Sequence, residues 1–195
     1  MARAKKISIE QATINAQMAF WQYGYHGLSV RKLEEVTSIN RFMLQTDFGG
    51  KDGLFIEALK SYIQMAQTFS FNDIAKGSSQ NIIDLFQQRV LNQQPKETQY
   101  GCLAVNTLSE ANIENSVIQS LLDDFFKGMQ DSFLEALLRD QKNKILKADI
   151  DCAQCAEFLV TTALGLNVLI RTKGDNKAGV VTVNAIIQCI NSWRV

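Results

Sequence analysis

Apolar residues recur along most of the chain at spacings of three and four positions, which is the period of an amphipathic helix. Alternation of apolar and polar positions, the pattern of a half-buried strand, is scarce. Pro95 is the only proline among 195 residues, so helices are rarely interrupted. The pattern therefore predicts an all-α fold.

The first predicted helix has clear start and stop signals. Ser8, three residues before Gln11, has the spacing of a capping box, and Gly24 suits the left-handed position after a helix. The apolar period predicts the buried residues of this helix, which are Ala12, Ala16, Ala19, Phe20 and Tyr23.

Two shorter helices are predicted next, each with a capping residue. Ser29 caps the second helix, and Asn40 caps a third helix from Arg41 to Phe48. Only residues 37–39 separate them, a tight connection typical of a helix-turn-helix. The second helix is expected to bury Leu33 and Val36.

Longer helical patterns follow. Gly49 and Gly50 end the third helix, and a long helix is predicted from Lys51 to about residue 74. Its buried face is expected to hold Leu54, Phe55, Ala58, Leu59, Tyr62 and Met65. Further helices are predicted over residues 81–92, 102–110, 116–143, 149–172 and 176–193, with loops at 93–97 and 173–176.

Charge and hydropathy limit the possible partners. Twenty basic and twenty acidic residues give no formal net charge, so a nucleic-acid contact must come from a local patch. The basic residues Arg3, Lys5 and Lys6 are not followed by the apolar core of a signal peptide. The uncharged stretch 158–170 would span about 20 Å as a helix, less than the ~30 Å hydrocarbon layer. We therefore expect a cytoplasmic protein with no membrane partner.

Catalytic and metal-binding residues are few. The four cysteines are expected to be reduced thiols, because no secretion signal accompanies them. Cys152 and Cys155 have C-x-x-C spacing but lack a strand–helix–strand context, and a zinc site would still need two more ligands. We interpret them as packing residues, with metal or redox chemistry as the alternative. His26 is the only histidine, which disfavours a cysteine-based enzyme. We expect no catalytic residue, metal or cofactor.

Three segments near the N-terminus form a longer motif: residues 24–33 (GYHGLSVRKL), 37–41 (TSINR) and 47–55 (DFGGKDGLF). In this order and without gaps they closely resemble the DNA-binding domain of the TetR family of bacterial transcription regulators. Residues 100–106 (YGCLAVN) resemble the Gly-Cys-Leu motif of one TetR subgroup. Residues 163–166 (ALGL), with Arg171, are similar to that subgroup's penultimate helix.

The resemblance implies a domain organisation and a function. Residues 1–50 would form a three-helix helix-turn-helix DNA-binding domain, joined by the helix from about 51 to 74. Residues 51–195 would form a larger helical domain for ligand binding and dimerisation. The implied function is a ligand-responsive transcription regulator, by default a repressor that a small molecule releases from a pseudo-palindromic operator.

Some positions depart from the family pattern. The family's recognition helix usually carries a small residue, then Ser or Thr, Leu and a phosphate-contacting Tyr, whereas this chain has Phe42, Met43, Leu44 and Gln45. Ser38 stands where the family's turn usually has Gly, which is unfavourable if that position is left-handed. The alternative function is therefore a TetR-fold helical interaction module that has lost or altered its reading of DNA sequence.

Base contacts are expected at the start of the recognition helix, because its N-terminal side chains meet base edges in the major groove. This assigns base reading to Arg41, Phe42, Met43 and Gln45. Arg41 can bond guanine, Gln45 adenine, and an apolar side chain can cover a thymine methyl. The alternative for Phe42 and Met43 is a place in the core.

Phosphate contacts need donors at helix starts and nearby cations. These requirements indicate Ser29, Arg31, Thr46 and Lys51. Lys51 begins its helix, where the dipole disfavours a cation, so an external anion such as phosphate would explain it. For Arg31 the alternative is a solvated face.

A ligand cavity is expected in the larger domain, because small ligands are held in mostly apolar cavities with few polar groups. The candidate wall residues are Phe69, Phe86, Cys102, Asn106, Phe125, Met129, Phe158 and Thr162. Asn106 and Thr162 would be polar anchors. Cys102 begins a helix, whose dipole favours the thiolate, and the resemblance implies that some members sense electrophiles there. The alternative for each is a place in the core.

The last two predicted helices are poor in charge. Their apolar residues include Leu159, Leu166, Ile170, Val180, Val183, Ile187, Ile190 and Trp193. The uncharged run 158–170 needs cover on more than one face, which a lone subunit of this size provides poorly. The family resemblance implies that a partner's helix pair supplies it, in a four-helix homodimer interface.

Overall fold

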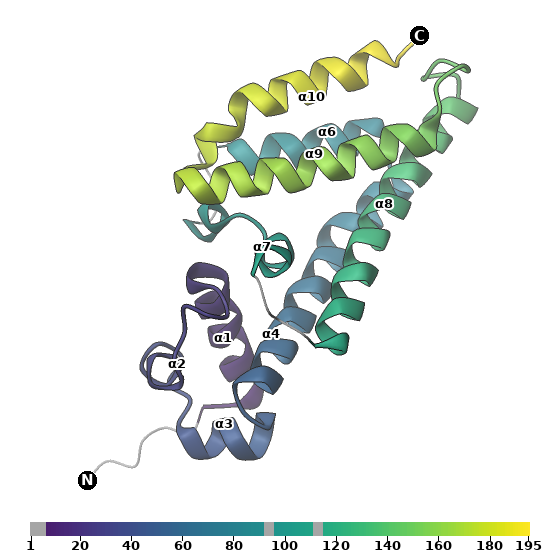
Figure 1. Ribbon diagram of the computed structural model, residues 1–195. Coiled ribbons are helices and arrows are strands. Elements are labelled where there is room, and N and C mark those ends of the chain that lie inside the picture. The colour runs from purple at the N-terminus through teal and green to yellow at the C-terminus, as the bar shows by residue number, and fades with distance from the viewer. Residues whose placement is uncertain (1–6, 92–95, 111–114) are drawn as a thin grey trace.

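The computed structural model describes residues 7–91, 96–110 and 115–195 (Figure 1). Within these ranges the chain forms helices and no strand, and its one isolated bridge joins Leu146 to Arg194. The all-α prediction is confirmed. The basic residues Arg3, Lys5 and Lys6 and most of the loop predicted at 93–97 lie outside the described residues.

Three helices form the N-terminal part of the fold, and the capping residues predicted at their N-termini are confirmed. They are α1 (Ile9–Tyr23), α2 (Val30–Thr37) and α3 (Arg41–Phe48). Ser8 Oγ accepts from the Gln11 amide at 3.1 Å. Asn40 Oδ1 accepts from the Met43 amide at 2.8 Å. Each bond satisfies an amide that the first turn leaves without a partner, which fixes where the helix begins. Helix α1 lacks the reciprocal bond of a capping box, because the Gln11 side chain donates to Asn15 instead.

The expected buried faces are largely correct, with three exceptions. Tyr23, Val36 and Met65 are exposed, and these three predictions are wrong. Trp21 is buried instead of Tyr23, because it turns toward the larger domain and its Nε1 donates to the Gly101 carbonyl at 3.1 Å. Thr37 is buried instead of Val36, with its hydroxyl bonded to a backbone carbonyl of its own helix. Met65 borders a hollow described below.

The long helix predicted from Lys51 is continuous but changes its winding. It consists of α4 (Lys51–Ala66), a π-helical turn η1 (Gln67–Phe71) and α5 (Asn72–Lys76). The remaining elements are α6 (Ser79–Val90), the 3₁₀ turn η2 (Lys96–Tyr100), α7 (Leu103–Ser109), α8 (Ser116–Lys142), α9 (Cys152–Lys173), the 3₁₀ turn η3 (Asn176–Gly179) and α10 (Val180–Ser192).

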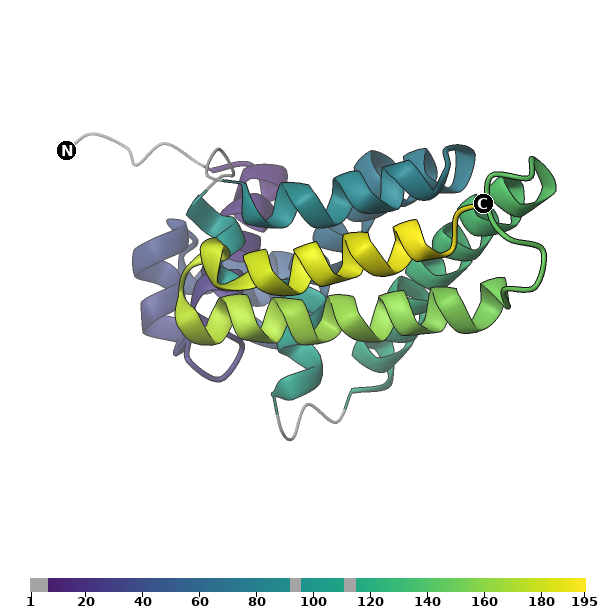
Figure 2. The same ribbon diagram turned by 90° about the horizontal axis from the view of Figure 1, so that it is seen from above.

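The larger part of the fold is a bundle to which the N-terminal helices attach at one end. Helix α4 runs from α3 into this bundle beside α8 (Figure 1). Seen from above, α10 lies between α6 and α9 (Figure 2), and it packs against α6. The short helix α7 contacts α1, α4, α8 and α9, so it sits where the two parts meet.

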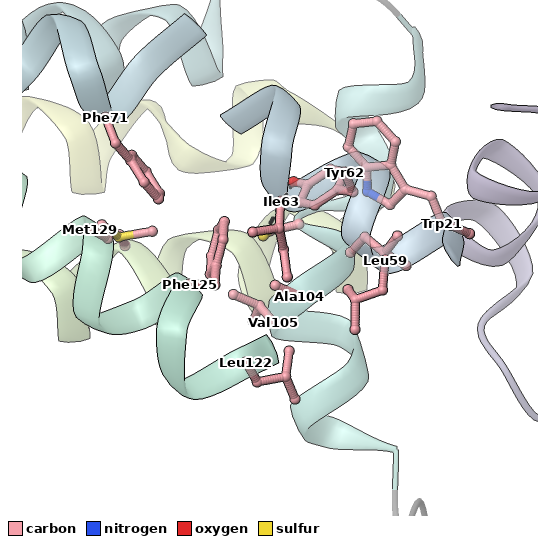
Figure 3. Packing of buried hydrophobic residues seen from close by; sticks show 14 of the residues in the cluster. Trp21, Leu59, Tyr62, Ile63, Phe71, Ala104, Val105, Leu122, Phe125 and Met129 are labelled. Carbon is pink, nitrogen blue, oxygen red and sulfur yellow. Dashed lines mark hydrogen bonds between the residues drawn. The ribbon is translucent and has the colours of Figure 1, made fainter. Parts of the chain in front are cut away.

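One apolar core joins both parts. Figure 3 shows Trp21 of α1 and Tyr62 of α4 close together, with Phe125 and Met129 of α8 and residues of α7 beyond them. The rings of Trp21 and Tyr62 meet edge to face at 5.3 Å, and Phe71 and Phe125 are 5.3 Å apart. Burying each such aromatic side chain contributes about 1.5–3 kcal/mol. Tyr62, Phe71, Phe125 and Met129 of this core also border the inner cavity described next.

Candidate DNA interface and ligand cavity

Helix α3 has two distinct faces. Met43, Leu44 and Phe48 are buried, and α3 packs mainly against α4. Arg41, Phe42, Gln45 and Thr46 are exposed together on the opposite face, and Phe42 keeps 77% of its surface open. Met43 was expected among the base readers. That expectation is wrong, because its position turns it toward Leu44 and into the core.

Arg41 has no carboxylate partner within the described ranges, so its guanidinium is available to a base. The hydroxyl of Thr46 lies 2.9 Å from the Phe42 carbonyl and 2.9 Å from Asp47 Oδ1. Its single hydrogen is thus used inside the helix. A phosphate contact by Thr46 would require that bond to break.

The turn between α2 and α3 contains a strained residue. Ser38 has φ 63° and ψ 17°, a left-handed conformation that costs a non-glycine residue roughly 1–2 kcal/mol. The Asn15 amide donates to the Thr37 carbonyl at 3.0 Å, and Thr37 Oγ1 accepts from the Ile39 amide at 3.2 Å. These bonds hold the turn in place despite the missing glycine.

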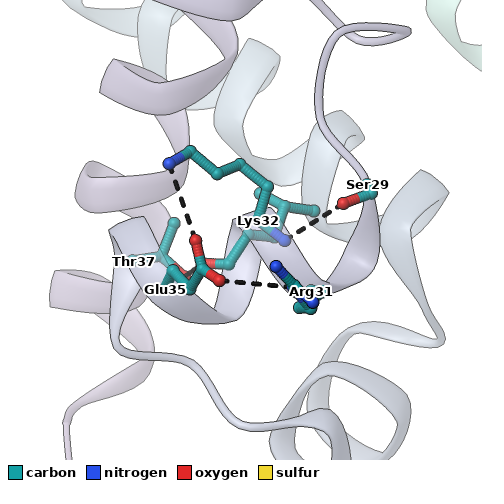
Figure 4. Close-up of polar contacts among 6 residues, drawn as sticks. Ser29, Arg31, Lys32, Glu35 and Thr37 are labelled. Carbon is teal, nitrogen blue, oxygen red and sulfur yellow. Dashed lines mark hydrogen bonds and ion pairs between the residues drawn. The ribbon is translucent and has the colours of Figure 1, made fainter.

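The expected phosphate-binding residues of α2 are used within the helix in this structure (Figure 4). Ser29 Oγ caps α2 by accepting from the Lys32 amide at 3.2 Å. Arg31 lies 3.4 Å from Glu35, and Lys32 Nζ lies 3.6 Å from the same carboxylate. Because the Arg31 side chain is 89% exposed, this ion pair contributes at most about 1 kcal/mol. A phosphate can therefore compete for it.

Lys51 has a partner that the sequence did not reveal. Its Nζ lies 4.1 Å from the centre of the Tyr25 ring, and the Tyr25 hydroxyl bonds the Asp52 carboxylate. Burial, followed by the bond to Asp52, raises the pKa of Tyr25 to about 12. Burial lowers the pKa of Lys51. The Tyr25 ring and the Asp52 carboxylate thus stabilise the Lys51 cation within the protein, so its position at the helix start needs no phosphate to explain it.

Besides the Trp21 bond to Gly101, two further contacts tie the N-terminal helices to the larger domain, and sequence reasoning predicted neither. The carboxylate of Glu110, after α7, accepts from the Tyr25 amide at 2.8 Å and from the His26 amide at 2.9 Å. Arg171 of α9 donates to the Trp21 carbonyl at 2.9 Å. No local pattern pairs residues 85 positions apart, so only the fold reveals the Glu110 contact.

A cavity of about 110 Å³ lies inside the larger domain, between α4, η1, α6, α8 and α9, with Cys102, the residue before α7, also on its wall. Four of the expected ligand residues are on its wall: Phe86, Cys102, Phe125 and Met129. Polar groups not anticipated from the sequence, Tyr62, Arg89 and Asn167, also line it. The Tyr62 hydroxyl donates to Cys102 Sγ at 3.3 Å. Burial, above all other causes, raises the pKa of Tyr62.

Four other expected ligand residues lie elsewhere. Asn106 is buried but donates to the Tyr100 carbonyl at 2.9 Å and does not line the cavity. Phe158 and Thr162 are on the outer side of α9, because Ala163, Leu166 and Asn167 occupy its inner side. The placing of Asn106, Phe158 and Thr162 on the cavity wall is therefore wrong. Phe69 is 74% exposed and borders a second hollow instead.

That outer hollow, of about 510 Å³, reaches the N-terminal part of the fold. Trp21 of α1, Met65 and Phe69 border it, with Glu97 of η2 at one side. It shares Tyr62, Ala66, Ser70 and Arg89 with the inner cavity, so the two spaces adjoin. A ligand that enters through the outer hollow would pass between α1 and the bundle.

The remaining cysteines are poor nucleophiles. Burial, above all other causes, raises the pKa of Cys152, Cys155 and Cys189. Among the described residues no three His, Cys, Asp or Glu side chains are grouped so as to hold a metal ion. Cys102 is buried, with Tyr62 as its hydrogen-bond partner.

Helices α9 and α10 expose a set of apolar residues that only partly matches the one expected. Of the expected set, Leu159, Leu166, Ile170, Val183 and Ile190 are buried inside the subunit. Val180 of the expected set is exposed, and so are Phe158, Val168 and Val181. Helix α9 is long and apolar enough to cross a membrane, but core helices of soluble proteins pass the same test, so this is weak evidence.

Comparison with known proteins places this geometry in a family. Residues 78–186, more than half of the chain, match the family described as "Tetracyclin repressor-like, C-terminal domain". The HTH-type transcriptional regulator YezE of Bacillus subtilis is 27% identical over 178 residues, which cover 90% of this chain and 92% of YezE. The HTH-type transcriptional repressor ComR of Escherichia coli is 25% identical over 175 residues, covering 87% and 82%.

Solved structures agree over nearly the full length. A cysteine mutant of the TetR family transcriptional regulator CifR, complexed with 26-bp double-strand operator DNA, superposes with a TM-score of 0.81 at 24% identity. The match covers 96% of this chain and 98% of that one. Reduced Escherichia coli NemR matches with a TM-score of 0.77 at 15% identity, over 95% and 96% of the two chains. With the matched C-terminal domain and a helix-turn-helix in front of it, this chain belongs to the TetR family of transcriptional regulators.

Proposed function

We propose that this protein is a cytoplasmic, homodimeric repressor that binds a pseudo-palindromic operator and leaves it when a small molecule occupies the larger domain. Residues 1–50 are the DNA-binding domain, and residues 51–195 bind the ligand and form the dimer. The observation that carries the proposal is the exposed face of α3, where Arg41, Phe42 and Gln45 stand free of the core. ComR, named a repressor, and CifR, solved on operator DNA, support it.

The DNA contacts divide into base reading and positioning. Arg41 carries a free guanidinium suited to a guanine, Gln45 an amide suited to an adenine, and Phe42 a ring suited to a thymine methyl. Arg31 and the first amides of α2, which Ser29 precedes, suit phosphate oxygens. Lys51 can bind a phosphate only if its ammonium group moves away from the Tyr25 ring.

The dimer interface is the exposed face of α9 and α10. Helix α10 contains no charged residue, and Val181 keeps 80% of its surface open. Phe158 and Val168 continue this apolar surface on α9. Between them Gly165 has open space where a side chain would begin, so a partner helix can approach closely. Covering this surface in a two-fold pair places two copies of α3 to read the two halves of an operator.

The cavity is positioned to control DNA binding through α4 and α7. Helix α4 begins at Lys51, directly after α3, and carries Tyr62 and Ala66 to the cavity wall. Helix α7 follows Cys102 at the cavity and leads to Glu110, which holds the turn after α1. A ligand that shifts these helices changes the spacing of the two α3 helices, and DNA affinity falls by a shift in populations.

A gel-shift titration tests the regulator against the interaction-module alternative. The probes are DNA from upstream of the protein's own coding region and random DNA of equal length, at fixed salt. The regulator prefers the upstream DNA by at least tenfold, and Arg41→Ala removes most of that preference. Equal affinity for both probes, with no effect of Arg41→Ala, would refute the regulator and leave the interaction module.

A further inference from the structure

Arg89 is a cation at the polar end of an otherwise apolar cavity. It lies in the last turn of α6, is half-buried, and borders both the inner cavity and the outer hollow. Its Nη2 donates to the Gly101 carbonyl at 3.1 Å and to the side-chain oxygen of Asn167. Both acceptors are neutral. No ion pair within the described ranges involves Arg89, and its Nε and Nη1 make no hydrogen bond there.

The wall of the inner cavity supplies no counter-charge. No Asp or Glu is among its lining residues, and Arg89 is the only formally charged one. A guanidinium stays protonated at every physiological pH, and a charge withdrawn from water is favourable only when it is paired. Its planar fork of N–H groups matches a carboxylate in two parallel hydrogen bonds. The cavity therefore has an unmet preference for an anion.

The rest of the wall describes the body of that anion. Phe71, Phe86, Phe125 and Met129 supply large apolar side chains to this wall. Its volume of about 110 Å³ is near that of an engineered apolar cavity of about 150 Å³ that admits benzene. This volume limits the body to a short alkyl chain or at most a single aromatic ring. The Tyr62 hydroxyl also lines the cavity, and its single hydrogen, now donated to the weakly accepting Cys102 sulfur, becomes a second donor to the anion when it turns away from that sulfur.

Resting on the proposed function, we infer that the effector is a small apolar carboxylic acid, bound as the carboxylate at Arg89 with its body among the aromatic residues of the inner cavity. Glu97, which borders the outer hollow, determines how the bound anion is oriented. Its negative charge repels an anionic head from that side, so the head faces the inner end of Arg89. Gly101, which accepts from Arg89, directly precedes Cys102 and α7, so the head also contacts the start of the helix that leads to Glu110.

The first test needs no variant. Isothermal titration calorimetry of the wild-type dimer, without DNA, compares benzoate, phenylacetate and hexanoate with their neutral amides. Each amide has the shape of its acid but no charge. The acids bind about ten- to one-hundredfold more tightly than the amides, the range expected for a charge-assisted hydrogen bond. Equal affinity within a pair, or no binding of any acid at millimolar concentration, overturns the inference.

Variants then locate the contact. Arg89→Gln removes the preference for acids over amides, and Arg89→Lys retains part of it. Arg139→Gln is the matched control, because Arg139 also donates to a backbone carbonyl, that of Gly77 at 2.6 Å, but lines neither space. Circular dichroism confirms that each variant folds. Identical affinities for Arg89→Gln and Arg139→Gln overturn the inference, and if Arg89→Gln does not fold, the wild-type comparison of acid with amide decides.

A gel shift separates this inference from the proposed function. An acid that binds the protein and lowers its affinity for upstream DNA supports both. If acids bind with the stated preference but the protein shows no preference for upstream DNA, the proposed function fails and the anion site stands. If the DNA preference is present and no acid binds, the inference alone fails.

Discussion

Replacing Glu110 with glutamine should loosen the turn that follows α1 without disturbing the rest of the fold. In the wild-type protein each carboxylate oxygen accepts one backbone amide, from Tyr25 at 2.8 Å and from His26 at 2.9 Å. Glutamine keeps one acceptor and presents an NH₂ group to the second amide. That amide must then find water.

The expected magnitude follows from the two bonds. A hydrogen bond to a charged group contributes about 1.5–3 kcal/mol and a neutral one about 1 kcal/mol. Because Glu110 is half-buried, the low end applies, so two charged bonds of about 1.5 kcal/mol are exchanged for one neutral bond. The local opening free energy of the turn should fall by about 2 kcal/mol. Protection from hydrogen exchange should then fall roughly thirtyfold.

Hydrogen exchange followed by NMR reads these two amides directly. Protection of Tyr25 and His26 should fall in Glu110→Gln while the amides in the middle of α8 keep theirs. Glu57→Gln is the control, because Glu57 is exposed and pairs only with Lys60 on α4, so its loss should cost less than about 0.5 kcal/mol. Unchanged protection at both amides, or the same loss in Glu57→Gln, would refute the reasoning.

Four other predictions follow from the same structure. Arg41→Ala should weaken binding to the preferred operator by about 1–3 kcal/mol and relax the sequence preference at one base pair per half-site. Lys51→Ala should weaken binding to cognate and random DNA alike and reduce the slope of log affinity against log salt concentration by about one. Equal losses of Arg41→Ala on all sequences would show that Arg41 reads no base. In sedimentation the wild type should have about twice the 21.9 kDa chain mass, and Gly165→Glu should be a monomer. A wild-type monomer at micromolar concentration would contradict the proposed dimer interface. Cys102→Ser should abolish any loss of DNA binding that electrophiles cause, since burial raises the pKa of the other three thiols. If wild-type protein treated with electrophiles binds DNA normally, Cys102 is only a packing residue. The pKa of Tyr25 is raised from 10.0 to about 12, so the folded state holds this proton more tightly and loses stability as pH rises between those values. The difference in unfolding free energy between wild type and Tyr25→Phe, measured by urea denaturation, should therefore shrink over that interval. A constant difference would contradict the assignment.

The local sequence determined the helices and their ends. Ser8, Ser29 and Asn40 begin α1, α2 and α3 where they were expected to, because a cap is a contact between residues three positions apart. The all-α fold follows from a period that is likewise local. The family resemblance was also readable, since the motif around the helix-turn-helix is contiguous in the chain.

The choice of which residues share a site needed the tertiary structure. One helical position is a rotation of about 100°, so Ala163 and Asn167 of α9 reach the cavity while Thr162 and Phe158 do not. Apolar periodicity marks which face is buried but not what covers it. The pattern therefore could not show that Met43 and Leu166 lie in the core of their own subunit. Glu110 with Tyr25, and Arg89 with Asn167, are pairs from distant parts of the chain. Their energies come from charges and donors that meet only after the helices pack, so no local pattern in the sequence encodes them.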